Sequence, residues 1–249
     1  MVSRCKFQSS SEIGAYALLT NSFAILPVST IDNFFTTQFE NALSTEKSFS
    51  IIHSSIAGTD IIGRLTVGNK HGLIFPSTAT HLEMDLIKNN LPDSVEVAQI
   101  EERFSALGNV VSCNDKIALI HPELEQATID VIQDILQVEA IPAIIGGESL
   151  VGSYSCLTNR GGVVCPNCTA EQIQELSELT GLTIEAATVN KGSNLISAGI
   201  CVNDNCLLCG WETTALEIAN LTRIFKIDDS QGKDEGIVDI DESLVDLIL

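Results

Sequence analysis

Basic side chains are scarce in this chain of 249 residues, which has 13 Lys and Arg against 33 Asp and Glu and a formal net charge of −20. A protein that binds a phosphate backbone needs a basic face, so this balance argues against free nucleic acid as a ligand. It also disfavours an anionic membrane. The excess of carboxylates fits a basic partner that is approached by electrostatic steering. An acidic surface that is merely solvated is the alternative.

Long apolar runs are absent as well. No stretch approaches 18 consecutive apolar residues, so we expect no transmembrane helix. The first residues, Met-Val-Ser-Arg-Cys-Lys, lead directly into polar Gln8 and Ser9 and contain no apolar core of a signal peptide. We therefore expect an intracellular chain whose eight cysteines are reduced.

Familiar catalytic motifs are missing too. The sequence has no Gly-x-Ser-x-Gly, His-Glu-x-x-His, phosphate-binding loop or Gly-x-Gly-x-x-Gly. Cys113 and Cys201 would become nucleophiles only if a histidine and a carboxylate converged on one of them. Four histidines are available, all expected at turns, strand ends or a helix start: His53, His71, His81 and His121. We expect no enzymatic activity and no cofactor.

A repeat organises what the chain does contain. Segments with an asparagine between two apolar runs recur at separations of 48, 45, 45 and 44 residues, at Asn21, Asn69, Asn114, Asn159 and Asn203. Asparagine tolerates a left-handed backbone, so each segment predicts a hairpin turn. Periods of this length are typical of propellers and solenoids built from one supersecondary unit.

A small residue precedes each turn by six or seven positions. It is Gly14, Gly63, Gly108 or Gly152 in four units, and Ser197 in the fifth. Glycine there predicts a bulge or a close approach of two backbone segments.

Each hairpin is followed by a segment with helical character and then by a further strand. The helices are expected over 32–43, 81–91, 123–136, 170–180 and 214–225, and the strands over 49–52, 95–100, 138–144 and 183–189. Thr169 and Thr213 are suitable N-caps, and Gly181 is suitable just after a helix C-terminus. One unit is thus three strands and a helix in cyclic order.

One unit of about 45 residues cannot bury a core alone, whereas five can close around a pseudo-fivefold axis. No unit has the features of a terminal cap, which favours a closed ring over an open solenoid. We predict an α/β fold, a five-bladed propeller, in one domain over residues 1–225. Residues 226–249 hold eight acidic and two basic residues and are predicted to form a flexible acidic tail.

Two Cys-x-x-Cys pairs, Cys165–Cys168 and Cys206–Cys209, have a spacing typical of zinc ligands. The 37 residues between the pairs exceed the ordinary spacing in a zinc ribbon. In the repeat, Cys165 and Cys209 share their position with apolar residues: Pro27, Phe75 and Ile120. We therefore expect these cysteines to pack as small apolar residues and to bind no metal.

Seven strings are long and specific enough to compare with known families. They are Ser-Ile-Ala-Gly-Thr at 55–59, Ile-Ile-Gly-Arg at 61–64, Asn-Leu-Pro-Asp-Ser-Val at 90–95, Glu-Glu-Arg-Phe-Ser-Ala-Leu-Gly-Asn at 101–109, Cys-Asn-Asp at 113–115, Val-Gly-Ser-Tyr at 151–154 and Thr-Val-Asn-Lys-Gly-Ser at 188–193. They closely resemble the eukaryotic translation initiation factor 6 family, along nearly all of residues 3–225. The end of the chain resembles it only at 241–244.

The resemblance implies the pentein fold, in agreement with the repeat. It implies a protein without catalytic activity that binds the intersubunit face of the large (60S) ribosomal subunit and blocks joining of the small (40S) subunit. It further implies a role in large-subunit biogenesis and nuclear export, hence a place in the cytoplasm, nucleus and nucleolus. The implied partners are basic ribosomal proteins near the sarcin–ricin loop, with a GTPase and its helper protein acting in release. We expect a monomer.

The alternative is a pentein-fold enzyme that modifies guanidines with a cysteine, a histidine and carboxylates. The sequence offers no evident histidine–cysteine pair of that kind.

The contact candidates follow from the repeat. The positions just after the small residues are Ala15, Arg64, Asn109, Ser153 and Ala198. Equivalent positions should lie on one face of the ring with different side chains, which suits recognition of an asymmetric protein surface. Lining the central channel is the alternative role. The family's subunit-contacting loops match the strings around Gly14, Arg64, Asn109 and Tyr154.

Overall fold

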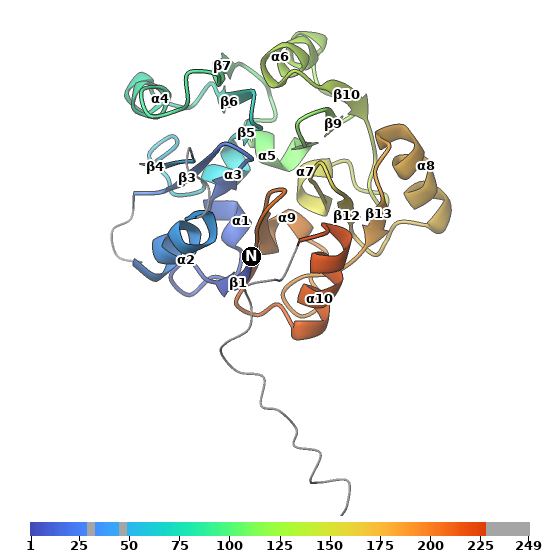
Figure 1. Cartoon of the computed structure of the whole chain (residues 1–249). Coiled ribbons are helices and arrows are strands. Elements are labelled where there is room, and N and C mark those ends of the chain that lie inside the picture. The colour runs from blue at the N-terminus through green and yellow to red at the C-terminus, as the bar shows by residue number, and fades with distance from the viewer. Residues whose placement is uncertain (29–32, 45–48, 228–249) are drawn as a thin grey trace, which may run out of the picture.

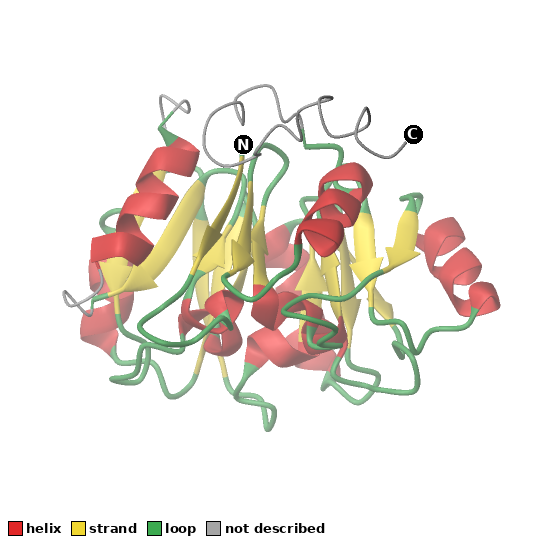
Figure 2. Ribbon diagram, turned by 90° about the horizontal axis from the view of Figure 1, so that it is seen from below, coloured by secondary structure: helices red, strands yellow, loops and turns green. Residues whose placement is uncertain are grey.

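The computed structural model describes residues 1–28, 33–44 and 49–227. The expected acidic tail from residue 228 onward and the expected helix start at residue 32 lie outside the described residues. The described strands form five three-stranded sheets around a central axis (Figure 1). Figure 2 shows these sheets from the side, with their strands running between the two faces of the ring. The expected α/β fold with five blades is confirmed.

Four blades share one connectivity. An antiparallel hairpin pairs the first strand with the second, and a crossover helix returns the chain to a third strand that is parallel to the second. Blade one contains β2 (Leu18–Leu19), β3 (Phe23–Pro27), α2 (Asn33–Leu43) and β4 (Ser50–Ser54), and blade two contains β5 (Val67–Gly68), β6 (Gly72–Pro76), α4 (His81–Lys88) and β7 (Glu96–Ile100). Blade three contains β8 (Val111–Cys113), β9 (Ile117–Ile120), α6 (Gln126–Leu136) and β10 (Glu139–Pro142). Blade four contains β11 (Ser155–Leu157), β12 (Gly162–Val164), α8 (Ala170–Thr180) and β13 (Ile184–Ala186).

The fifth blade joins the two ends of the described chain. It contains β14 (Ile200–Val202), β15 (Leu207–Gly210) and α10 (Ala215–Ile224), and its third strand is β1 (Val2–Cys5). β1 pairs in parallel with β15, from Val2 opposite Leu207 to Cys5 opposite Gly210. The first unit is therefore paired with the last, which confirms a closed ring.

The hairpin turns are confirmed, with a shift of one position in two units. In each turn an opening side chain accepts hydrogen bonds from the backbone N–H groups two and three residues later, as Asn114 Oδ1 does at 2.8 and 2.9 Å. The opening residues are Thr20, Asn69, Asn114, Thr158 and Asn203. A threonine hydroxyl and an asparagine amide both supply this acceptor. Asn21 and Asn159 consequently occupy the second turn position, with Lys70, Asp115 and Asp204.

Some helix ends differ from expectation, most clearly where two adjacent threonines could each serve as the N-cap. α10 is capped by Thr214 instead of Thr213, because Thr214 forms a capping box with Glu217 three residues later. Thr213 instead donates its hydroxyl to Asn190 at 3.0 Å. Thr169 caps α8 as expected, and Gly181 follows that helix with a φ of 65°. α4 ends earlier than expected and α6 begins later.

Five one-turn helices form an inner ring that the periodicity did not predict. They are α1 (Ile13–Tyr16), α3 (Ile62–Leu65), α5 (Leu107–Val110), α7 (Val151–Tyr154) and α9 (Ile196–Gly199). Each contacts its two neighbours around the axis (Figure 1). A Cβ added to Gly63 would lie 2.1 Å from the Gly14 carbonyl oxygen, and one added to Gly108 would lie 2.0 Å from the Gly63 oxygen. The expected close backbone approach is confirmed.

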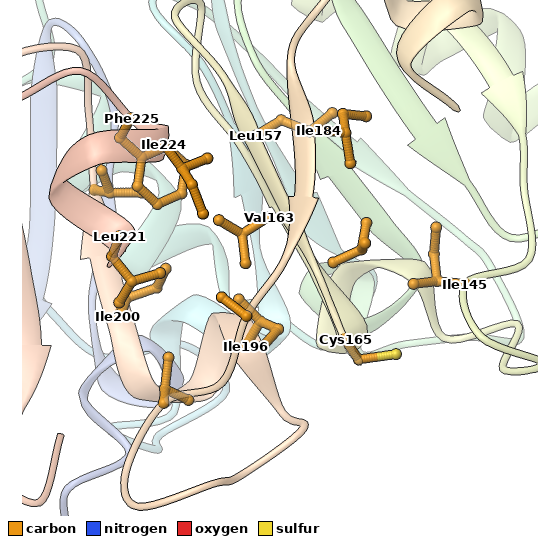
Figure 3. Close-up of a cluster of buried hydrophobic side chains, with 14 of the residues drawn as sticks. Ile145, Leu157, Val163, Cys165, Ile184, Ile196, Ile200, Leu221, Ile224 and Phe225 are labelled. Carbon is orange, nitrogen blue, oxygen red and sulfur yellow. The ribbon is translucent and has the colours of Figure 1, made fainter. Parts of the chain in front are cut away.

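Crossover helices fill the spaces between blades. α2 packs against β1, α4 against β4, α6 against β6 and β7, and α10 against β12, in each case a strand of the preceding blade. Figure 3 shows one such space, where Leu221 and Ile224 of α10 and the C-cap residue Phe225 meet Val163 of β12. The packing continues to Ile227, which is 5% exposed. Every helix in the described residues is too short or too polar to cross a membrane.

Candidate functional site

The axial face is the end of the ring formed by the one-turn helices and the loops that precede them, which we call the rim loops. The five contact candidates are the third residues of these helices, so the structure brings Ala15, Arg64, Asn109, Ser153 and Ala198 together around the axis. Each helix lasts one turn because the next residue is already extended and leads into a strand, as Thr66 does after α3.

Arg64 links three blades at the axial face. Its Nη1 donates to Ser197 Oγ at 3.0 Å and to Ser153 Oγ at 3.3 Å, and Ser153 Oγ donates to Asn109 Oδ1 at 3.1 Å. Ser197 also donates to the Gly152 carbonyl. The sequence identifies Ser197 only as the counterpart of the glycines. The serine in place of glycine is the sequence feature that sets this unit apart. It does not by itself predict that Ser197 accepts a hydrogen bond from Arg64.

The Arg64 guanidinium retains donors for a ligand. Arginine has five N–H donors, and both hydrogen bonds use Nη1. Within the described residues, Nη2 and Nε have no hydrogen-bond partner. Burial lowers the pKa of Arg64, and the nearby Glu12 carboxylate opposes that shift. The side chain is therefore a half-buried cation held in place by two hydroxyls.

The other candidates present unequal surfaces. Ala15, Ser153 and Ala198 are buried, at 8%, 4% and 2% exposed, whereas Asn109 and Tyr154 are half-buried. Gly14 lines the central channel, a cavity of about 120 Å³ that also touches Gly63, Gly108, Gly152 and Ser197. Arg64, Asn109 and Tyr154 are thus the candidates with half-buried polar side chains. Contact of any candidate with a partner stays a prediction.

Carboxylates on the crossover helices hold two of the rim loops. Glu83 of α4 accepts from Ser55 Oγ at 2.7 Å, from Gly58 N at 2.9 Å and from Ala57 N at 3.1 Å. Burial alone would raise the pKa of Glu83, but hydrogen bonds from Ser55, Gly58 and Thr80 outweigh it and lower the pKa to about 2. Glu217 of α10 binds the loop of Thr188, Lys191 and Gly192 in the same way.

The opposite end of the channel, which we call the hairpin end, is closed by a polar network. Asn21 Nδ2 donates to Asp115 at 2.7 Å and Asp204 at 3.0 Å, and Asn159 Nδ2 donates to the same two carboxylates at 2.6 and 2.7 Å. Burial would raise the pKa of Asp115, but hydrogen bonds from Asn159 and Asn21, followed by Lys70, hold it below its usual range. A cavity of about 30 Å³ lies beside this network and is lined by Asn21 and Asp115 among others.

Comparison with known proteins shows which family the chain resembles. The eIF-6 family matches residues 2–224. The chain belongs to the eIF-6 family. The expected resemblance is confirmed.

Two relatives illustrate the similarity. Eukaryotic translation initiation factor 6 of Toxoplasma gondii is 43% identical over 251 residues, covering 100% of this chain and 94% of its own length. The protein of the same name from Saccharomyces cerevisiae is 43% identical over 231 residues, covering 93% of each chain.

Solved structures give a partial likeness. A dimethylarginine dimethylaminohydrolase has a TM-score of 0.47 at 14% identity, covering 75% of this chain and 74% of that one. The N-terminal domain of ArgZ, an arginine dihydrolase, has a TM-score of 0.49 at 13% identity, covering 76% and 73%. Likeness at this level carries no conclusion about the chemistry of the eIF-6 family chain.

Burial raises the pKa of both candidate nucleophiles of this eIF-6 family chain, Cys113 and Cys201. Cys113 and Cys201 line the channel, and their sulfurs lie 3.6 and 3.9 Å from the carbonyl oxygens of Gly68 and Ala17. Burial, followed by the Asp115 charge, raises the pKa of Cys113 to about 12. A catalytic thiol needs the opposite shift, so the surroundings of Cys113 do not favour a nucleophilic thiolate.

Among the described residues, the two Cys-x-x-Cys pairs do not converge on one four-cysteine site. Cys165 and Cys168 belong to a core cluster that extends from Leu119 of blade three to Cys209 of blade five. Cys206 and Cys209 sit in different core clusters, because residues three apart in an extended segment point to opposite faces. Among the described residues, no three Cys, His, Asp or Glu side chains come together as metal ligands.

Proposed function

We propose that this eIF-6 family member binds the intersubunit face of the large (60S) ribosomal subunit and prevents its premature association with the small (40S) subunit. It also takes part in large-subunit biogenesis and nuclear export, which requires a place in the cytoplasm, nucleus and nucleolus. The observation that carries the proposal is 43% identity, over the full chain, to a protein named eukaryotic translation initiation factor 6. Membership of the eIF-6 family supports a role as a translation initiation factor.

The axial face is the binding surface in this proposal. It holds the chain's half-buried Arg64 cation, with free donors, beside the half-buried Asn109 amide. Two of the rim loops around it are pinned by Glu83 and Glu217, so these two lose little conformational entropy on binding. The hairpin end, by contrast, uses its central carboxylates internally.

Basic ribosomal proteins near the sarcin–ricin loop are the proposed partners. The net charge of −20 raises the rate of encounter with a basic surface and disfavours membranes and free nucleic acid. A GTPase and its helper protein act indirectly, in release from the subunit. The chain acts as a monomer.

Sedimentation tests the proposal. The full chain is mixed with purified large or small ribosomal subunits and separated on sucrose gradients at several salt concentrations. We expect sedimentation with large subunits alone, and weaker binding as salt rises, because screening acts over about 8 Å at physiological ionic strength. Equal sedimentation with small subunits contradicts the proposal.

A further inference from the structure

One crossover helix leaves its interblade space partly unfilled. Four helices pack against a strand of the preceding blade, whereas α8 packs chiefly against β13 of its own blade. Figure 1 shows α8 at the outer edge of the ring, beside β13 and separated from β10. The gap is a groove of about 330 Å³, lined on one side by Pro122, Pro142 and Ile144 and on the other by Glu175, Leu176 and Leu179.

The groove exposes apolar side chains on both of its sides. Ile144 is 52% exposed and Leu179 is 50% exposed, while Leu176 is buried at the floor. The volume is at the low end of ligand sites, which span roughly 300–1,000 Å³. It accommodates a few side chains of a bound segment, not a folded domain.

The surroundings of the groove are mainly acidic, and the basic side chain of Arg103, near Pro122, is paired with Glu123. Residues 117–190 contain ten carboxylates and one basic residue, Arg160. Arg160 is at the hairpin end, where its Nη1 donates to the Lys226 carbonyl. α8 itself contains Glu171, Glu175 and Glu178 and has no Lys or Arg. An occupant must therefore combine apolar side chains with positive charge.

We propose that the α8 groove is a second interaction surface, which binds an amphipathic segment of a partner protein. The segment places two or three aliphatic side chains in the groove and Lys or Arg against the Glu171–Glu178 side of α8. This is helix-in-groove recognition with charge complementarity at the rim. The groove adjoins the axial face, because Ile144 lies in the rim loop that precedes α7, whereas its α8 side is not part of that face. The proposal does not depend on the proposed function.

Two occupants from the chain itself fit less well. Residues 228–249 hold eight carboxylates and one basic residue, so like charges would meet at the rim. A second copy carries the same net charge of −20 and meets the same repulsion. A basic partner is the occupant that the charge pattern favours.

The test uses a fluorescein-labelled 18-residue Leu/Lys peptide with leucines at helical spacing as the probe. It is titrated into the full chain, whose Ile, Leu and Val methyl groups are followed by NMR. We expect shifts concentrated at Ile144, Leu176 and Leu179. Leu179→Ser and Ile144→Ser should each weaken binding about tenfold, because central apolar anchors dominate such interfaces. Leu82→Ser is the matched control, since Leu82 is 83% exposed on α4, and should change affinity less than twofold.

Four outcomes overturn the proposal. They are no binding of the peptide, shifts spread over other acidic surfaces, displacement of the probe by a peptide of residues 228–249, and dimerisation that protects the same methyl groups. Because the shifts are mapped on the unsubstituted chain, a variant that folds poorly does not spoil the test. A peptide of equal charge with scrambled leucines must bind at least tenfold more weakly if the groove recognises amphipathic helices.

Discussion

The two ends of the central channel are built by opposite means. At the axial face, glycines remove side chains so that five one-turn helices touch through their backbones, and one arginine spans the ring. At the hairpin end, short polar side chains point inward, and two aspartates are bridged by two asparagines. The hairpin end satisfies its buried charges internally. The axial face leaves donors of its central cation open.

The contrast between the two ends suggests that one end closes the ring and the other binds a partner. Buried donors and acceptors that pair with one another fix a structure but offer little to a ligand. A half-buried guanidinium with free N–H groups offers charge and geometry to a partner. We infer that the hairpin end locks the five blades and that the axial face is available for binding.

Gly63→Ala should have the largest effect. Its Cβ would lie 2.1 Å from one backbone oxygen and 2.4 Å from another, and neither can move without opening the inner ring. We expect a loss of about 3 kcal/mol or more, which lowers the melting temperature by roughly 6–12 °C for a chain of this size. Differential scanning calorimetry measures it.

The control for that prediction is Gly58→Ala. Gly58 has a φ of +69° but nothing within 4 Å of an added Cβ, so only backbone strain of about 1 kcal/mol is expected. Equal losses in the two variants would show that close packing of the glycine ring is not what limits stability.

Asp115→Ala should have the next largest effect on stability, and it tests whether the polar network at the hairpin end holds the five blades together. The substitution leaves the Asn21 and Asn159 amides without one acceptor each, and buried donors without partners cost about 2 kcal/mol. Urea unfolding should show the loss, while binding of the remaining folded chain to large subunits stays unchanged. Asp134→Ala, on the exposed side of α6, should change stability by less than about 0.5 kcal/mol. If Asp115→Ala weakened large-subunit binding without lowering stability, the proposal that the hairpin end is structural and the axial face binds would be wrong.

Arg64→Ala should weaken large-subunit binding by roughly thirtyfold, or ~2 kcal/mol. The loss of its two hydroxyl contacts should lower the melting temperature by only a few degrees. Asn109→Ser should act in the same direction. Lys116→Ala removes the same charge from the exposed hairpin end and serves as the control. A fall in melting temperature with unchanged affinity of the folded fraction would make Arg64 a structural residue.

Glu83→Gln should have the smallest effect, confined to one rim loop. The pKa of Glu83 is lowered to about 2 in the folded chain, so its contribution is complete above the unfolded pKa of about 4.3 and is lost as pH falls toward 2. We expect hydrogen exchange at Ala57 and Gly58 to quicken over that window in the native chain. In Glu83→Gln it should be fast already at neutral pH. An unchanged pH profile in the variant would exclude Glu83 as the loop's anchor.

The sequence predicted the ring, because five hairpin turns at even spacing need only a local signal. It did not predict the one-turn helices, since four residues are too few for helical periodicity. The one-position shift at Thr20 and Thr158 arose because threonine replaces asparagine as the turn acceptor. Thr213 and Thr214 are adjacent, and only the reach of Glu217 decides between them.

The site was less predictable than the fold. Glycine spacing placed Arg64 and Asn109 at the axis correctly. The hydroxyl partners of Arg64 are 89 and 133 residues away in the chain, and no local pattern links them. The α8 groove depends on how far a helix sits from its neighbouring blade, which the helix's own residues do not encode.

Hydrogen exchange of the full chain, alone and bound to purified large ribosomal subunits, tests the assignment of binding to the axial face most directly. We predict that binding slows exchange in the rim loops at 57–61 and 146–150. Exchange at the hairpin turns, 69–72 and 114–117, should be unchanged. Slowed exchange at the hairpin turns with no change in the rim loops would contradict it.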